Sequence, residues 1–238
     1  MVIILKCTCW YTFAKISFYP IWIGYLLMKF DMRFDAKALF LLSLVLLTLL
    51  ISITKVEWLL TWNVHLIEDV QALILLLCVP FTWFYMKPKS LSDQKKWFWM
   101  WAIAWWFMFF GRSISWGRDF FPDVEKIYFR VISVVVIAPV VFMLFSSKLR
   151  AEIAYKVRFV RFPFWYLMIA IVSLFFADCV EHHRLIGSWL LTDIASQDVV
   201  EELYETPFIF ALFSAALFFM QQDRPVEVDM AMVYTESN

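Results

Sequence analysis

The sequence predicts an all-α fold, a polytopic transmembrane helix bundle. Of its 238 residues, 63% are hydrophobic and 20% aromatic, whereas soluble domains average about 45–50% apolar residues. The apolar residues are also grouped into runs of about twenty, the length of a helix that crosses a bilayer. Glycine is scarce, at four residues, and no low-complexity linker divides the chain. We therefore expect a single transmembrane domain over residues 1–221 and a short polar cytoplasmic tail over 222–238.

Seven apolar segments have about the length of a membrane-spanning helix. The first is rich in aromatic residues and carries Lys15, so it either spans or lies at the interface; without it the bundle has six helices. The second is rich in leucine, the third opens with Glu68 and Asp69, and the fourth ends in a polar turn. The fifth is apolar, the sixth ends in Asp178 and its neighbours, and the seventh opens with three glutamates. Their predicted bounds are 8–28, 36–54, 66–86, 97–119, 127–146, 162–183 and 200–220.

Basic residues predict the orientation of these helices. One set of loops, together with the tail, carries thirteen Lys and Arg residues, and the opposite set carries six. The positive-inside rule makes the first side cytoplasmic, which gives an N-out/C-in, multi-pass protein of the cell inner (plasma) membrane. The thirteen are Lys29, Arg33, Lys37, Lys87, Lys89, Lys95, Lys96, Lys148, Arg150, Lys156, Arg158, Arg161 and Arg224, and the six are Lys55, Arg112, Arg118, Lys126, Arg130 and Arg184.

Four of the predicted helices carry polar clusters, and alternation of the chain puts all four clusters on the outer side. The apolar part of each helix is too short to span alone. Residues 207–220, for example, number 14, about 21 Å of helix against a hydrocarbon core of roughly 30 Å. The polar ends must therefore enter the membrane boundary. A polar pocket sunk into the outer leaflet accounts for this, because water or paired charges must fill it.

Carboxylates exceed bases at these helix ends. Eight acids face three arginines, which leaves five carboxylates unmatched. Because an unpaired charge in the membrane is costly, some of them must be solvated, protonated or bound to a cation. The acids are Glu68, Asp69, Asp119, Asp178, Glu181, Glu201, Glu202 and Glu205, and their candidate charge partners are Arg112, Arg118 and Arg184.

One stretch has the residue types of a metal site. Asp178, Glu181 and His182 fall at i, i+3 and i+4, on one helix face, and Glu201 or Glu205 could complete a ligand set. Carboxylate and imidazole ligands suit Zn²⁺ or Mn²⁺. The alternative is a charge network in which Arg112 and Arg184 neutralise the carboxylates. Further ligand candidates on the same side are Glu68 and His65.

The fourth helix offers a candidate catalytic residue. Arg112, Ser115 and Asp119 share one face at i, i+3 and i+7. Ser115 could act as a nucleophile, or it could simply bridge polar groups by hydrogen bonding, and His182 is the second candidate catalytic residue. Arg112 is expected to pair with Asp178 or Glu181 across the fourth and sixth helices.

Residues 66–221 resemble a group of uncharacterised bacterial polytopic inner-membrane proteins. These share acidic helix ends and an Ile-Ser-Trp-Gly motif at a helix end. The matching residues here are Glu68, Ile114-Ser115-Trp116-Gly117, Asp178 to His182 and Glu201-Glu202. The group usually has Glu before the motif and Gln after it, where this chain has Ser113 and Arg118. The layout also resembles ceramidase-type membrane hydrolases, although their His-x-x-x-His pair is absent.

Three functions follow as expectations. The first is a membrane protein whose outer-leaflet pocket binds a cation, a proton or a polar ligand, working with other membrane subunits or a second copy in transport or envelope assembly. The second is a metal-dependent membrane hydrolase, and the third is a purely structural membrane subunit. The lipid bilayer is the expected partner in each case. With 21 basic and 21 acidic residues, nothing suggests a nucleic-acid partner.

Overall fold

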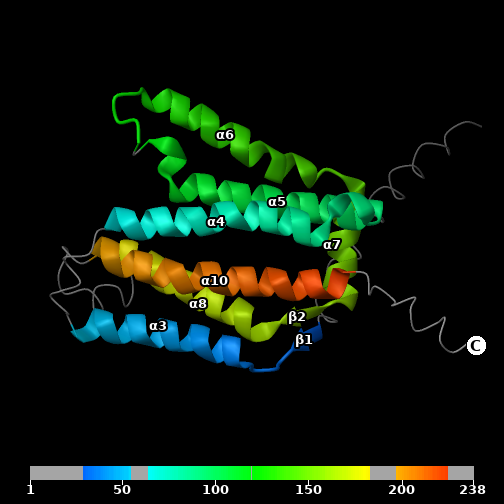
Figure 1. Cartoon of the computed structure of the whole chain (residues 1–238), viewed down its shortest axis with the longest axis horizontal. Coiled ribbons are helices and arrows are strands. Elements are labelled where there is room, and N and C mark those ends of the chain that lie inside the picture. The colour runs from blue at the N-terminus through cyan, green and yellow to red at the C-terminus, as the bar shows by residue number, and fades with distance from the viewer. Residues whose placement is uncertain (1–28, 55–63, 119, 183–196, 225–238) are drawn as a thin grey trace, which may run out of the picture.

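The computed structural model describes residues 29–54, 64–118, 120–182 and 197–224. The segment predicted at 8–28, Arg184, Asp119 and the end of the tail lie outside the described residues. Long helices lie side by side along one axis (Figure 1). In chain order the elements are β1 (Lys29–Asp31), α3 (Ala36–Thr54), α4 (Val64–Met86), η2 (Pro88–Ser90), α5 (Asp93–Ser113), η3 (Ser115–Gly117), α6 (Lys126–Met143), α7 (Ser147–Phe159), β2 (Arg161–Pro163), α8 (Phe164–Glu181) and α10 (Gln197–Asp223).

The described chain is mostly helical, and five of its helices are long and apolar enough to cross a membrane. They are α3, α4, α6, α8 and α10. The predicted bounds agree with these helices to within a few residues. Helix α5 is not among the five, because its charged first turn and its tryptophans lower its mean hydropathy. It nevertheless packs along α4 as a full member of the bundle.

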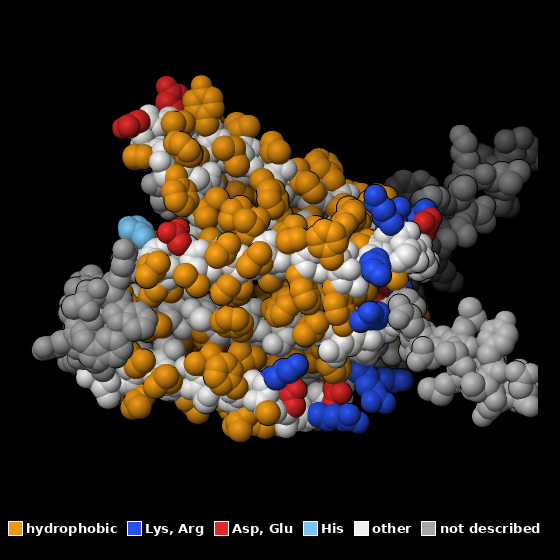
Figure 2. All heavy atoms as spheres, in the orientation of Figure 1, with side chains coloured by type: hydrophobic (Ala, Val, Ile, Leu, Met, Phe, Trp, Pro, Cys, Tyr) orange, Lys and Arg blue, Asp and Glu red, His pale blue; other side chains and the backbone are white. Residues whose placement is uncertain are grey.

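The outer surface of the bundle is apolar along its sides, as contact with lipid requires. On α6, Val134 and Phe142 are 65% and 69% exposed, and hydrophobic side chains cover the flank seen in Figure 2. Charged side chains gather at the two ends instead. This distribution suits a protein whose surrounding solvent is hydrocarbon along the middle and water at both ends.

The core lies where α3, α8 and α10 meet. Helices α8 and α10 make the most extensive helix–helix contact in the described chain. Small residues on both, among them Ala170, Ala177, Ala211 and Ala215, are almost completely buried. Small side chains let helix backbones approach closely, which is how membrane helices gain packing energy.

A short helix and two short strands were not predicted. Residues 147–161 were expected to be a loop, but they contain α7, a helix with Leu149, Glu152 and Lys156 buried on one face. The strands β1 and β2 also pair in parallel, with Phe30 opposite Phe162. Both strands lead into helices that start at the same end of the bundle, α3 and α8, so their chains run in the same direction.

A buried charge network fixes α7 to the bundle. Lys156 donates a hydrogen bond to Asp223, and its Nζ lies 3.4 Å from Glu152 Oε1. Asp223 also accepts a hydrogen bond of 2.8 Å from the Trp99 indole and lies 3.7 Å from Lys95. The side chains of Lys156 and Asp223 are only 4% and 3% exposed. Helix α10 thus continues into the predicted tail, and its last residue is part of the core.

Candidate functional site

The helix ends predicted to carry polar residues come together in space. The starts of α4 and α10 and the ends of α5 and α8 lie at one end of the bundle (Figure 1). We call this the acidic end, defined by Glu68, Arg112, Asp178, Glu181, Glu201, Glu202 and Glu205. Two hollows are cut into it, and both are lined by Arg112 and Glu205.

The first hollow lies between α4, α5 and α10 and has a volume of about 150 Å³. Its apolar wall is formed by Leu75, Phe109, Phe208 and Ile209. The charged residues lining it are Glu68, Arg112, Glu201, Glu202 and Glu205. Four carboxylates therefore face a space in which one guanidinium supplies the positive charge.

The second hollow lies between α5, α8 and α10, with a volume of about 450 Å³. Asp178 and Glu181 line it together with Arg112 and Glu205, and its remaining wall is apolar. Acids from α8 and α10 therefore line the same hollow. Glu201 and Glu202 lie in the first hollow and not in this one.

Arg112 has a different partner from the one expected. Its Nη2 lies 3.7 Å from Glu205 Oε1 on α10, and the structure shows no ion pair between Arg112 and the α8 carboxylates within the described chain. The expected pairing with Asp178 or Glu181 was wrong because Glu205 of α10, on the wall shared by both hollows, lies within ion-pair distance of the guanidinium. Neighbour relations of this kind cannot be deduced from helix order.

The end of α5 explains how its polar residues reach the first hollow. Ser115, Trp116 and Gly117 have φ values of 48°, 61° and 91°, all in the left-handed region. The chain therefore reverses sharply, and the Trp116 ring folds back over Gly111. A Cβ at Gly111 would lie 2.7 Å from that ring, so a larger residue would force the ring or the helix to move. The Ile-Ser-Trp-Gly segment is thus a turn that closes α5 and places Ser113 and Ser115 on the wall of the hollow.

Ser115 shows none of the surroundings of an activated nucleophile. In the described part of the chain it makes no hydrogen bond to a base. His182, the other candidate catalytic residue, lines neither of these two hollows. Arg118, a predicted charge partner, follows the turn and lines neither hollow.

Helix α10 is held at its start by two polar contacts that the sequence analysis missed. Gln71 of α4, which is 3% exposed, donates 2.9 and 3.1 Å hydrogen bonds to the Glu202 carbonyl and Thr206 Oγ1. Pro207 has no N–H, so the carbonyl of Leu203 lacks its usual helical donor. Thr48 of α3 lies 3.4 Å from that carbonyl and donates to it. A polar residue one turn after Glu68 on a membrane helix was the available signal for Gln71.

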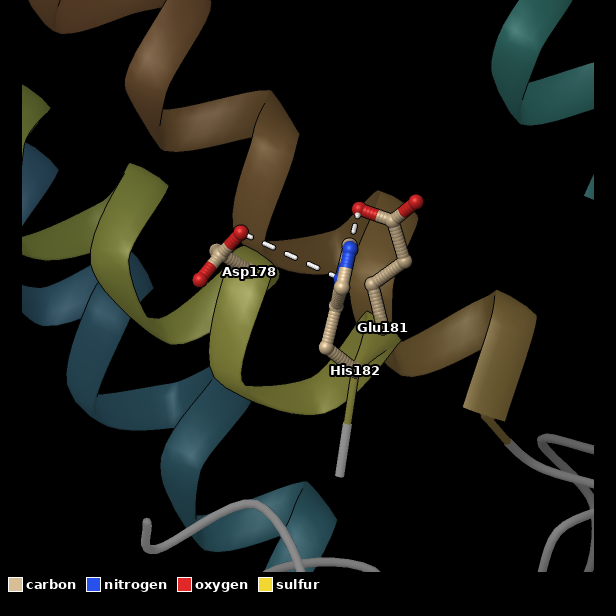
Figure 3. A group of neighbouring side chains, drawn as sticks. All are labelled: Asp178, Glu181 and His182. Carbon is tan, nitrogen blue, oxygen red and sulfur yellow. Dashed lines mark ion pairs between the residues drawn. The ribbon is translucent and has the colours of Figure 1, made fainter. Parts of the chain in front are cut away.

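The predicted metal-ligand triad is present as a geometric group at the last turn of α8. The His182 ring lies between two carboxylates, as Figure 3 shows: its Nδ1 is 3.4 Å from Glu181 Oε2 and 3.9 Å from Asp178 Oδ1. One potential ligand atom from each residue lies within 4.8 Å of the others. All three are exposed, and Glu201 and Glu205 do not belong to this group. The set offers three ligands to a Zn²⁺ or Mn²⁺ ion, with water completing the coordination.

The remaining predicted ligands, His65 and Glu68, lie at the rim of the first hollow. His65 Nδ1 is 3.1 Å from Glu68 Oε2, one turn away on α4, and the His65 side chain is 80% exposed. This pair connects the first hollow to the surrounding solvent.

Comparisons with protein-family models, with curated proteins and with solved structures found no match to the chain.

Proposed function

We propose that this chain is a multi-pass protein of the inner membrane that binds a cation, either a divalent metal or protons, at its acidic end. The observation that carries the proposal is the first hollow, in which Glu68, Glu201, Glu202 and Glu205 face a single arginine. Arg112 pairs with Glu205 and His65 lies beside Glu68, so in the described chain Glu201 and Glu202 are left without a base within ion-pair distance. At the edge of a bilayer such groups must be solvated, protonated or bound to a cation, and we infer a bound cation or proton here.

The path for a cation follows from the shared wall of the two hollows. The exposed group of Asp178, Glu181 and His182 stands at the rim of the second hollow. Arg112 and Glu205 line both hollows, and Glu201 and Glu202 lie beyond them. A cation captured at the rim would compete with Arg112 for Glu205. We infer that displacement of this guanidinium opens the first hollow, as part of transport or of assembly with other subunits.

The orientation is part of the proposal. The thirteen basic residues of one side predict that the end opposite the acidic end is cytoplasmic, with the amino terminus outside. Cysteines at exposed positions test this, with Lys89→Cys expected to be protected from an impermeant reagent in intact cells and Glu125→Cys expected to react. Lys156 is unsuitable for this test because it is buried. The reverse pattern would contradict the orientation and place the acidic end in the cytoplasm.

The test of cation binding is a thermal-stability series on the purified protein in detergent or nanodiscs. A bound metal stabilises the folded state by RT ln(1 + [L]/Kd), about 2.7 kcal/mol at a hundredfold excess over Kd. We expect chelator to lower the unfolding temperature and Zn²⁺ or Mn²⁺ to restore it. For a proton site, chelator has no effect and stability varies with pH instead.

Matched variants assign the response to the acidic end. Asp178→Asn tests the rim and Glu205→Gln tests the wall between the hollows. Glu125→Gln removes an exposed carboxylate just before α6 that lines neither hollow and serves as the control. Both test variants should lose the metal or pH response while the control keeps it. Equal responses in all three would contradict the site.

A structural role is the second candidate, because Gln71, Thr206 and the Arg112–Glu205 pair also tie α4, α5 and α10 together. It predicts that Asp178→Asn and Glu205→Gln alter stability without altering any response to metal or pH.

A further inference from the structure

The end of the bundle opposite the acidic end has a hollow of mixed charge that the proposed cation site does not use. It lies between the segment that enters α3, the start of α8 and the last turns of α10, and its volume is about 320 Å³. Four alternating charged residues, Asp31, Arg33, Asp35 and Lys37, line it together with Trp165. In Figure 2, acidic and basic side chains stand together near the start of α3, next to apolar surface.

An apolar groove continues from this hollow along the side of the bundle. The groove lies between α3 and α10, has a volume of about 450 Å³ and is lined mainly by Phe40, Leu41, Leu44 and Phe210. Lys37 and Ser214 line both spaces, so the charged hollow and the groove adjoin at these two side chains. We call the two adjoining spaces the compound cavity. From Lys37 to Leu44 the groove follows α3 for about 10 Å, on the surface that faces lipid.

The charged side chains of the hollow are held in different ways. Asp35 accepts hydrogen bonds from the Tyr166 hydroxyl at 2.6 Å and from the Ala38 N–H at 2.9 Å, which fixes its carboxylate. Asp31 accepts a bond from the Arg33 N–H at 3.0 Å, and the Arg33 guanidinium lies 3.9 Å away. In the described part of the chain, Lys37 has no carboxylate within ion-pair distance. The hollow thus presents two anions and two cations. One of the cations, Lys37, is available to an external anion.

We propose that this compound cavity binds a zwitterionic phospholipid with a primary-amine headgroup, of the phosphatidylethanolamine class. The phosphate lies against Lys37 and Arg33, the ammonium donates hydrogen bonds to Asp31 and Asp35, and one acyl chain lies in the groove between α3 and α10. A hollow with equal numbers of anions and cations fits a zwitterion better than an anionic headgroup, because the two carboxylates would repel an unbalanced negative charge. The apolar groove requires that the ligand carry a hydrocarbon chain.

The headgroup series tests the proposal on the unmodified protein. Native mass spectrometry and thermal unfolding would compare phosphatidylethanolamine, phosphatidylcholine and phosphatidylglycerol with identical acyl chains. We expect phosphatidylethanolamine to bind about tenfold more tightly than phosphatidylcholine, whose quaternary ammonium cannot donate hydrogen bonds. Equal affinities for these two lipids, or preference for phosphatidylglycerol, would overturn the proposal.

Variants locate the lipid in the cavity. Asp31→Asn should reduce the preference for phosphatidylethanolamine over phosphatidylcholine. Lys37→Gln should lower the affinity for both lipids. Lys96→Gln removes an exposed cation of α5 that lines neither space and serves as the matched control. If Lys96→Gln weakened binding as much as Lys37→Gln, the binding would be unspecific charge attraction. Asp178→Asn at the opposite end should leave lipid affinity unchanged, which separates this test from that of the cation site.

Discussion

Both ends of the helix bundle contain charged side chains buried among helix ends, but the two ends differ in charge balance and in packing. In the buried charge network of Lys95, Glu152, Lys156 and Asp223, two cations meet two anions, and Trp99 adds a hydrogen bond. At the acidic end, four glutamates share one arginine around an open hollow. The buried charge network is neutral and closed, whereas the acidic end is negative and hollow.

This difference separates charges that hold a membrane protein together from charges that serve a ligand. A buried pair is tolerated when Coulomb attraction and hydrogen bonds compensate for the lost hydration, and the network around Lys156 meets that condition without any added ion. The acidic end does not meet it until a cation or a proton arrives. Neutralising a carboxylate should therefore have opposite effects in the buried charge network and at the acidic end.

The largest effect is expected at the buried network. Asp223→Asn leaves Lys156 and Lys95 with Glu152 as the only carboxylate of the network. Loss of one partner from a buried pair typically costs about 3–5 kcal/mol. Unfolding in denaturant should show a loss of this size. The triple variant Lys156→Met, Asp223→Leu and Glu152→Leu removes all three buried charges and should recover much of the loss. A triple variant as unstable as the sum of the three single variants would contradict the pairing.

The next effect concerns the turn that closes α5. Gly111→Ala places a Cβ 2.7 Å from the Trp116 ring, so the ring or the helix must shift. Overpacking of this kind costs about 1–3 kcal/mol. Thermal unfolding should show the loss, and combining Gly111→Ala with Trp116→Leu should restore part of it by removing the ring. Unchanged stability in the single variant would mean that Trp116 does not pack on Gly111 in the folded protein.

Neutralising a glutamate at the acidic end should have the opposite sign. Glu202→Gln removes one of four carboxylates around Arg112 and leaves the Glu202 carbonyl free to keep its bond from Gln71. In chelator at pH 8 we expect stability to rise by a few tenths to about 1 kcal/mol, as like-charge repulsion is relieved. The gain should shrink at high salt, which screens the repulsion. A loss comparable to that of Asp223→Asn would remove the distinction between the two ends.

The smallest effect is a pH dependence at Asp35, just before α3. Burial raises the pKa of Asp35, but the Tyr166 hydroxyl, the Ala38 N–H and the Lys37 charge outweigh burial and hold it below its ordinary value of 3.8. The stabilisation is therefore present above pH 3.8 and is lost as pH falls through the lower folded-state pKa. When unfolding is measured from pH 6 down to pH 3, the free energy of unfolding should fall more steeply in the wild type than in Asp35→Asn. Parallel curves would mean that Asp35 is not stabilised in the folded protein.

The sequence was sufficient for features that depend on local patterns. Run length identified α3, α4, α6, α8 and α10, because a span needs about twenty apolar residues wherever its neighbours lie. Helical spacing identified the group of Asp178, Glu181 and His182. Alternation of the chain brought the polar ends of four helices to the same end of the bundle.

The sequence was insufficient where contacts depend on packing. Lys156 and Asp223 are 67 residues apart, and each looked like an ordinary loop or tail charge. Helix α7 was missed because its charge-rich sequence resembles a loop unless one knows that its buried face meets the bundle. The partner of Arg112 was misassigned because helix order does not say that α10 lies nearer than α8.

The most direct test of the central claim is calorimetric titration of Zn²⁺ and of Mn²⁺ into the purified, chelator-treated protein in nanodiscs. Repeating each titration in buffers of different ionisation enthalpy also measures protons released from the carboxylates and the imidazole. The account predicts saturable metal binding with proton release, both greatly weakened in Asp178→Asn and in Glu205→Gln and retained in Glu125→Gln. No saturable heat in the wild type, together with stability that does not vary with pH, would contradict a cation site at the acidic end.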